Sequence, residues 1–264
     1  MAKRKRVLAI GDLHCGHHFG LTPPEYQESQ KLPRGRMQRL YWKFYETEVK
    51  RLGAIDLLVL NGDAVDGKGK HTSAREQITT DMFEQVGMAI ECVRIARPKQ
   101  VVMTFGTPYH TGDSDRWEAI LAEMLRTELG IPVKIGPHES VDVNGVVFDC
   151  KHKIGGSSVP HGRHTAGART ALWNMIWSGV GQRPPGDIFL RSHVHYCVYE
   201  GDPLLYLAMT LPALQGLGDE YGSTQCENLV HFGIVYFDVR GKGDYDWHTR
   251  ILPWSMVPEQ ITKV

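Results

Sequence analysis

Short apolar runs alternate with longer amphipathic stretches through the first half of the chain. The runs at residues 7–10 and 57–60 are wholly apolar, as expected for strands that are buried on both faces. Between such runs, apolar residues recur at helical spacing, which predicts helices over 37–52, 74–95 and 115–129. This alternation is typical of an α/β fold, in which helices connect the strands of a sheet.

After residue 139 the pattern changes to short strands. Asn144-Gly145 separates the runs 140–143 and 146–149, and this spacing predicts a tight β-hairpin. A further helix is predicted over 165–177, and strands are predicted over 204–210, 233–239 and 245–251. The expected fold class is therefore α/β with a two-sheet interior.

Residues that bind metals occur in two closely spaced pairs. Asp12 and His14 follow the apolar run 7–10, and His193 and His195 follow the run 188–190. Residues two positions apart on a strand point to the same face, so each pair can offer two ligands to one ion. Each pair also stands where a buried strand is expected to end, which is where open α/β sheets bind their ligands.

Three further strand ends carry candidate ligands. Asp63 follows the run 57–60, His110 follows a strand that enters a turn rich in Gly and Pro, and His152 follows the run 146–150. Asp or His at each of these strand ends predicts that the side chains meet in one metal site.

The order of these blocks resembles the calcineurin-like metallophosphoesterases, whose pattern is D-x-H, G-D-x-x-D, G-N-H-[DE], a lone His and G-H-x-H. The matching segments are Gly11-Asp12-Leu13-His14, Gly62-Asp63-Ala64-Val65-Asp66, His152 and Ser192-His193-Val194-His195. The order and approximate spacing match over most of the chain. The resemblance implies a four-layer αββα sandwich with two mixed β-sheets.

The resemblance also implies a dinuclear metal centre, with a metal-activated water as the nucleophile. It assigns Asp12, His14 and His195 to the first ion, His152 and His193 to the second, and Asp63 as the bridge. A bridging carboxylate suits the chemistry, because it offers two oxygens whereas an imidazole offers one lone pair. Mixed imidazole and carboxylate ligands favour transition metals, with manganese expected first and iron, zinc, cobalt or nickel as alternatives.

One block departs from the family's pattern. Where the family has Gly-Asn-His, this chain has Gly106-Thr107-Pro108-Tyr109-His110. Thr107, Tyr109 or water could replace the missing Asn, and we expect a more weakly held second ion because a hydroxyl is a poorer neutral donor than an amide carbonyl. By similarity, His110 is the candidate acid or electrostatic partner of the leaving oxygen, the alternative being an exposed loop histidine.

Four more polar residues are candidates for supporting roles. Asp66 is expected to hydrogen-bond a metal ligand, or else to be a turn residue before Gly67. His17 is a candidate substrate contact because of its proximity to the D-x-H block, and His161 and His164 are candidates because positive residues cluster near them.

The substrate class follows by analogy. The Ser/Thr protein phosphatases of this superfamily carry Arg directly after the second Asp of G-D-x-x-D, where this chain has Gly67. The D-x-H block is closer to the phosphodiesterase and nuclease branches, so we expect a phosphodiester substrate of the nucleotide or nucleic-acid type. The alternatives are a phosphomonoesterase of the same fold and a noncatalytic metal-binding or nucleic-acid-binding protein.

Composition bounds the remaining possibilities. The chain has 264 residues and no evident linker or repeat, so we expect a single domain over 1–264. With 30 basic and 30 acidic residues it lacks the basic excess usual for duplex binding. No apolar stretch approaches the ~20 residues of a membrane span, and five scattered cysteines without C-x-x-C spacing fit reduced thiols in a cytoplasmic protein. No pattern specifies an oligomeric state.

Overall fold

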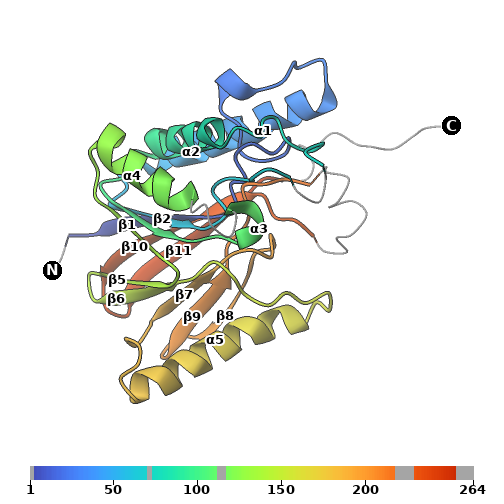
Figure 1. Ribbon diagram of the computed structural model, residues 1–264. Helices are drawn as coiled ribbons and strands as arrows, with labels where there is room; N and C mark the ends of the chain where they lie inside the picture. The colour runs from blue at the N-terminus through green and yellow to red at the C-terminus, as the bar shows by residue number, and fades with distance from the viewer. Residues whose placement is uncertain (1–2, 70–72, 112–116, 218–228, 254–264) are drawn as a thin grey trace.

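Two β-sheets lie face to face in the computed structural model, which describes residues 3–69, 73–111, 117–217 and 229–253 (Figure 1). The first sheet has the order β11-β10-β1-β2-β3-β4, with strands at Asp244–Ile251, Gly233–Gly241, Lys5–Ile10, Leu57–Asn61, Val101–Thr104 and Val133–Gly136. The second has the order β5-β6-β7-β9-β8, with strands at Glu139–Val143, Val146–Cys150, Ile188–Arg191, Tyr206–Thr210 and Val198–Asp202. Each sheet contains both parallel and antiparallel neighbours.

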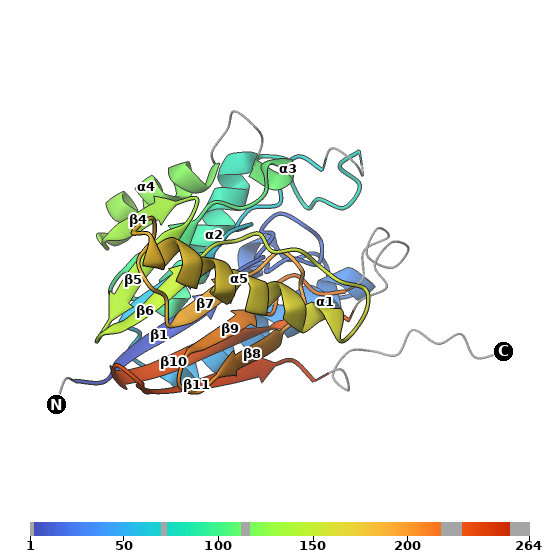
Figure 2. The same cartoon turned by 90° about the horizontal axis from the view of Figure 1, so that it is seen from below.

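Helices cover the outer face of each sheet. Three helices, α1 (Pro33–Leu52), α2 (Met82–Ala96) and α4 (Trp117–Leu129), lie over the first sheet (Figure 1). Helix α5 (Gly162–Gly179) crosses the second sheet on its outer face, as the view from below shows (Figure 2). Two short helices, η1 (Pro24–Tyr26) and α3 (Pro108–Thr111), lie in connections. The expected fold, an αββα arrangement with two mixed sheets, is confirmed.

The central strands explain the wholly apolar runs of the sequence. Val7 and Ala9 of β1 face the core between the two sheets, whereas Leu8 and Ile10 face the core under the helices. Both faces of the strand are therefore buried, and no position along it can be polar without losing hydration. Between the sheets, the ring of Phe148 packs edge-on against Phe237, with 5.1 Å between the ring centroids.

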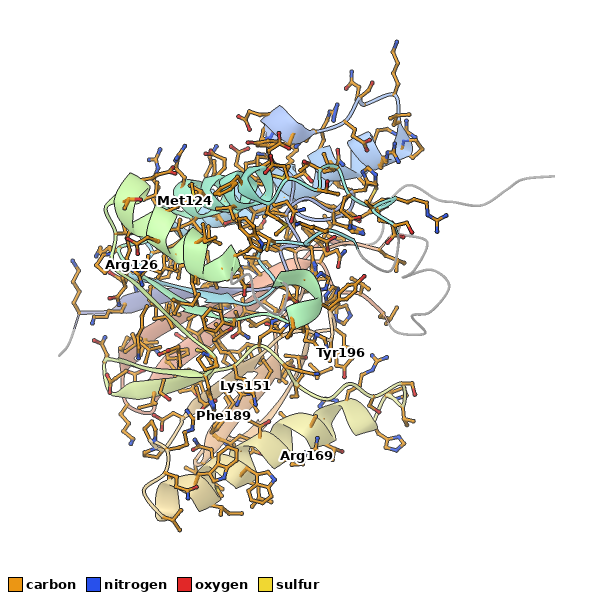
Figure 3. The ribbon with its side chains drawn as sticks, viewed as in Figure 1. Met124, Arg126, Lys151, Arg169, Phe189 and Tyr196 are labelled. Atoms are coloured by element: carbon orange, nitrogen blue, oxygen red, sulfur yellow. The ribbon has the colours of Figure 1, made fainter. Side chains whose placement is uncertain are left out.

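Helix α5 forms the fourth layer and packs on the second sheet through small residues. Its Ala171 packs with Phe189 and Ala208 of the second sheet, and Phe189 lies on the side of that sheet that α5 covers (Figure 3). Small side chains on the buried face allow the helix to approach the sheet closely.

The structure corrects the start of one helix. Helix α2 begins at Met82 and not at residue 74, because the Asp81 side chain caps it by accepting hydrogen bonds from the N–H groups of Phe83 and Glu84. Ile78 therefore precedes the helix, although it still packs against the core as its apolar character predicts. Residues 115–116, which the third helix was expected to include, lie outside the described residues.

Other elements agree with the pattern or were missed for a clear reason. The hairpin at Asn144-Gly145 is confirmed, since both residues are left-handed, with φ of 54° and 87°, as a type I′ turn requires. Strands β4 and β8 were not predicted, because their residues are largely half-buried or exposed and form no apolar run. Across the described ranges, no helix is both long and apolar enough to cross a membrane. The cysteines at 15, 92, 150 and 197 are free thiols.

The packing between the sheets predicts the result of one substitution. Phe148→Ala should lower the free energy of unfolding by about 3–5 kcal/mol, because it removes a fully buried ring from the inter-sheet core. Phe83→Ala, which truncates a ring that is 62% exposed, should cost less than about 1 kcal/mol. Urea unfolding of both variants measures the difference, and equal losses would contradict the two-sheet core.

Candidate metal centre

The candidate ligands come together because parallel strands end at one edge of the fold. Strands β1, β2 and β3 run parallel in the first sheet, and β6 and β7 run parallel in the second. The loops after β1 and β2 stay side by side beyond the strands, since the N–H groups of Asp12 and His14 donate to the carbonyls of Gly62 and Asp63. The loop after β7 joins them through the His193 N–H, which donates to the Asp12 carboxylate at 3.0 Å.

The backbone of these loops differs from the extended geometry that was expected of the two pairs. Positive φ angles, between 44° and 76°, occur at Asp12, His14, Asp63, His193 and His195. The pairs therefore lie beyond their strands, and sharp left-handed turns, not strand alternation, aim the side chains inward. Such a conformation costs on the order of 1 kcal/mol for a non-glycine residue, and several such residues clustered together are typical of functional sites.

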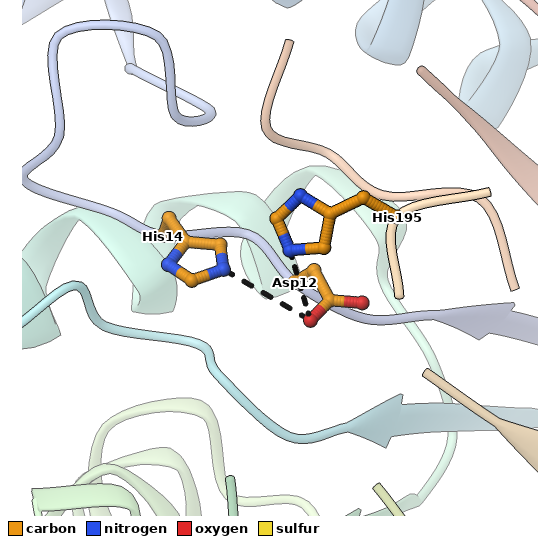
Figure 4. A group of neighbouring side chains, drawn as sticks. All are labelled: Asp12, His14 and His195. Atoms are coloured by element: carbon orange, nitrogen blue, oxygen red, sulfur yellow. Dashed lines mark ion pairs between the residues drawn. The ribbon is translucent and has the colours of Figure 1, made fainter. Parts of the chain in front are cut away.

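The first ligand group consists of Asp12, His14 and His195, whose candidate ligand atoms all lie within 4.8 Å of one another. Figure 4 shows the two imidazoles directed at one carboxylate oxygen, Asp12 Oδ1. That oxygen is 3.9 Å from His14 Nε2 and 3.5 Å from His195 Nε2. We call this set the Asp12 group.

The second ligand group consists of Asp63, His152 and His193. His152 Nε2 lies 2.9 Å from Asp63 Oδ2 and 3.9 Å from Asp12 Oδ1. His152 therefore borders both carboxylates, and the two groups are direct neighbours. We call the second set the Asp63 group.

Two histidines show that the site suits a cation. The Nδ1 atom of His14 contacts Asp66 Oδ1 at 2.9 Å, and that of His152 contacts the Asn61 carbonyl at 2.8 Å. Each Nδ1 must donate to its oxygen, so Nε2 is the atom through which each ring would bind a metal. Both Nε2 atoms are buried and have no aligned hydrogen-bond partner, even though Asp63 is close to one of them. A metal ion would satisfy both atoms.

Burial and neighbouring charges set opposite protonation states for the same two rings. Burial, together with the charge of His110, lowers the pKa of His14 to about 4. Burial also acts to lower the pKa of His152, but the carboxylates of Asp63 and Asp12 outweigh it and raise that pKa to about 10. Asp63 resists the effect of its own burial in the same way, since the neighbouring His152 holds its pKa below the usual range. The carboxylate oxygens of Asp12 and Asp63 therefore favour a positive charge beside them.

His110 lies in the short helix α3 and is half-buried. Its ring packs edge-on against His14 with 4.4 Å between the centroids, and its Nδ1 contacts the Asp66 carbonyl at 2.8 Å. Burial acts to lower its pKa, but the hydrogen bond to Asp66 and the charge of Asp63 raise it to about 9. His110 also belongs to a third group of ligand atoms with His14 and Asp63.

Thr107 and Tyr109 differ in how they lie relative to the centre. The buried Thr107 donates from its backbone N–H to Asp63 Oδ1 at 2.7 Å, and its hydroxyl is 3.2 Å from both Asp63 oxygens. Tyr109 is 38% exposed and packs its ring against His110. Of the two candidates for the place of the missing Asn, Thr107 is the one whose side chain faces the ligands.

The four supporting candidates fall into two classes. Asp66 is buried and accepts hydrogen bonds from His14 Nδ1 and from Gln77 at 2.6 Å. His17 is also buried, with Nδ1 accepting from the Phe19 N–H and Nε2 3.7 Å from a Glu76 oxygen. His161 and His164 are exposed at the start of α5, and neither belongs to a ligand group among the described residues.

Three further buried polar residues, which the motifs do not include, hold the ligand loops. Asn61 donates to Ser192 Oγ at 2.8 Å and so connects the two sheets. The Gln85 side chain accepts from the N–H groups of Asp66 and Gly67. Glu118 accepts from the N–H groups that flank the site, and burial together with the charge of Asp63 raises its pKa to about 7.

A signal for two of these residues, Asn61 and Glu118, is present in the sequence. Asn61 is a polar residue at the end of a wholly apolar strand. Glu118 stands three, four and seven positions before the buried Leu121, Ala122 and Leu125, on the face of α4 that packs inward. A polar residue on such a stripe must find a buried partner, which is the reason to examine it.

The site's glycines allow close approach of the loops. A Cβ on Gly62, where φ is 79°, would lie 2.4 Å from His152 Nδ1. A Cβ on Gly106 would lie 2.0 Å from Asp63 Oδ1. Side chains at these two positions would push apart the ligands that the strand ends bring together.

Comparisons with known proteins give a likeness of fold. No protein-family model and no curated protein sequence matches the chain. An archaeal phosphodiesterase of known structure is 15% identical, with 94% of this chain and 99% of that chain covered and a TM-score of 0.48. A purple acid phosphatase from yellow lupin (Lupinus luteus) seeds is 10% identical, with 98% of this chain and 53% of that chain covered and a TM-score of 0.48.

The protonation of His152 predicts how metal binding depends on pH. With a pKa of about 10, His152 carries a proton in the metal-free protein at neutral pH. A divalent ion that binds its Nε2 must displace this proton, so manganese affinity should rise with pH from about 6 to about 8.5, by up to about tenfold per unit. His14, with a pKa of about 4, should release none. Calorimetry in two buffers of different ionisation heat counts the protons, and a pH-independent affinity would contradict this account.

Proposed function

We propose that this protein is a metallophosphoesterase that hydrolyses a phosphodiester of the nucleotide or nucleic-acid type at a dinuclear centre. The observation that carries the proposal is the adjacency of the Asp12 group and the Asp63 group, with two buried Nε2 atoms aimed at the same carboxylates. Three ligands on each side, arranged around two carboxylates, fit a pair of divalent transition metal ions. Manganese is the first candidate, and iron, zinc, cobalt or nickel would suit the same ligands.

Asp63 and His110 have different roles in the proposed reaction. A bound pair of divalent ions would activate a water molecule and stabilise the negative charge that builds up on the phosphoryl oxygens. Asp63 would hold both ions, because a carboxylate offers two oxygens and this one is oriented by the Thr107 N–H and lies 2.9 Å from His152 Nε2. His110 donates from Nδ1 to the Asp66 carbonyl, so its Nε2 holds the proton that can pass to the leaving oxygen.

The pKa of His110 suits that role. At about 9 it keeps the ring protonated near neutral pH, when a general acid must carry its proton. Asp66 holds both His14 and His110, through a side-chain oxygen and its backbone carbonyl respectively. The proposed acid and a proposed metal ligand are therefore oriented by one residue.

The backbone at Gly67 supports the proposed substrate class. The superfamily's Ser/Thr protein phosphatases carry Arg at this position, but here φ is 86° and a Cβ would lie 2.2 Å from the His110 carbonyl oxygen. An arginine therefore does not fit this loop, and the contacts it would make to a phosphoprotein are missing. This favours the diester over a phosphoprotein.

The proposal predicts diester hydrolysis that depends on Asp63. Protein stripped of metal and refilled with manganese should hydrolyse bis-p-nitrophenyl phosphate faster than p-nitrophenyl phosphate. Asp63→Asn should lower turnover by roughly 1000-fold or more, because metal charge supplies several kcal/mol of transition-state stabilisation. Asp244→Asn, at an exposed aspartate paired with Arg240, is the matched control and should leave turnover unchanged. Monoester preference would indicate a phosphatase, and no turnover of either ester would favour a noncatalytic binding protein.

The position of Thr107 predicts a gain from substitution. Thr107→Asn places an amide carbonyl, a stronger neutral donor than a hydroxyl, beside the Asp63 group. The second manganese ion should then bind roughly tenfold more tightly, the scale on which changes around metal ligands alter affinity. Calorimetric titration measures this, with Thr127→Asn on the surface of α4 as the control. An unchanged second affinity would show that residue 107 does not contribute to the site.

A further inference from the structure

One carboxylate near the proposed centre is fully buried and yet belongs to no ligand group. Glu118 lies in the first turn of α4, and its exposed fraction is zero. Burying a carboxylate is costly unless donors compensate for the lost water. A glutamate kept at this position must therefore have strong partners, and its partners indicate what it does.

Both partners of Glu118 are backbone N–H groups next to site residues. Oε1 accepts from the Ala64 N–H at 3.1 Å, and Oε2 accepts from the Gly106 N–H at 2.7 Å. Ala64 directly follows Asp63, and Gly106 directly precedes Thr107. One side chain therefore ties the loop after β2 to the loop after β3.

These bonds form part of a closed ring. The Thr107 N–H donates to Asp63 Oδ1 at 2.7 Å, so the ring runs from Glu118 through Gly106 and Thr107 to Asp63 and back through Ala64. Hydrogen bonds to a charged acceptor are stronger than those between neutral groups. The ring fixes the Asp63 carboxylate from two sides.

The fit around Asp63 leaves no room for the loops to move closer. A Cβ on Gly106 would lie 2.0 Å from Asp63 Oδ1, so backbone and carboxylate are already in contact there. Asp63 also stands in a left-handed conformation with φ of 50°, which must be held by its surroundings. Glu118 supplies such a constraint from a helix, the more rigid part of the structure.

We propose that Glu118 is a positioning residue of the metal centre, which sets the Asp63 carboxylate by bridging the backbone N–H groups of Ala64 and Gly106. The inference rests on the proposed metal function. Its effect should be larger on the Asp63 group, because its hydrogen bonds reach the loops after β2 and β3, whereas the Asp12 group is affected only through its link to Asp63.

The test is manganese binding by Glu118→Gln. Glutamine keeps the size of the side chain and one acceptor, but its NH₂ group faces an N–H donor, so one bond of the ring is lost. We expect the affinity of the Asp63 group to fall roughly tenfold or more, and that of the Asp12 group to fall by less, because it depends on Asp63 only as a shared carboxylate. Calorimetry separates the two events, and His193→Ala identifies the one that belongs to the Asp63 group.

Two further variants serve as a control and as a substitute for Glu118→Gln. Glu48→Gln is the matched control, since Glu48 is a buried glutamate of α1 that pairs with Arg51 and Arg250 away from these loops. Glu118→Asp keeps the charge but is one methylene too short to reach both N–H groups, and it serves if the glutamine variant does not fold. Circular dichroism verifies folding before each titration.

The outcomes separate this inference from the proposed function. Selective weakening of the Asp63 group in a folded Glu118 variant supports the positioning role. Unchanged binding of two manganese ions overturns that role while leaving the metal centre intact, and equal weakening of both groups overturns it as well. Wild-type protein that binds no manganese overturns the proposed centre and this inference with it.

Discussion

A buried asparagine joins the two sheets at the edge where the candidate ligands gather. Asn61 ends β2 in the first sheet, and its side chain donates to Ser192 Oγ beyond β7 in the second. Its backbone carbonyl accepts a hydrogen bond from His152 Nδ1, and its side-chain oxygen accepts one from the Thr104 hydroxyl. With the His193 N–H bond to Asp12, this connection adds directional polar contacts between the sheets, and such contacts fix a lateral register that apolar packing alone does not. The relation of the Asp12 group to the Asp63 group depends on it.

The ligand loops contain strained backbone and a buried polar atom without a partner, and the rest of the fold must offset their cost in stability. Five candidate ligands hold left-handed backbone conformations, and the buried Nε2 of His14 has no hydrogen-bond partner among the described residues. Both features lower the stability of the metal-free protein. A bound cation would compensate for them, since ligands that bind only the folded state stabilise it. The geometry of the site therefore lowers the stability of the metal-free protein and favours binding of a cation.

The sequence predicted the general plan and several of the residues, but not their local geometry. Buried strands such as 57–60 could be read because both faces are apolar, and the turn at Asn144-Gly145 could be read because its residues favour positive φ. The left-handed turns at Asp12 and His193 could not, because nothing in these residue types specifies such a conformation. Glu118 and Asn61 stand out as polar residues on apolar stripes, but their partners are distant in sequence and no spacing rule identifies them.

We propose two ions side by side, one held by the Asp12 group and the other by the Asp63 group. Anomalous diffraction at the manganese edge, from crystals of the protein grown with manganese, tests it most directly. The account predicts two peaks about 3.5–4 Å apart, one beside His14 and His195 and the other beside His152 and His193, with Asp63 between them. A single peak, or peaks away from these residues, would contradict it.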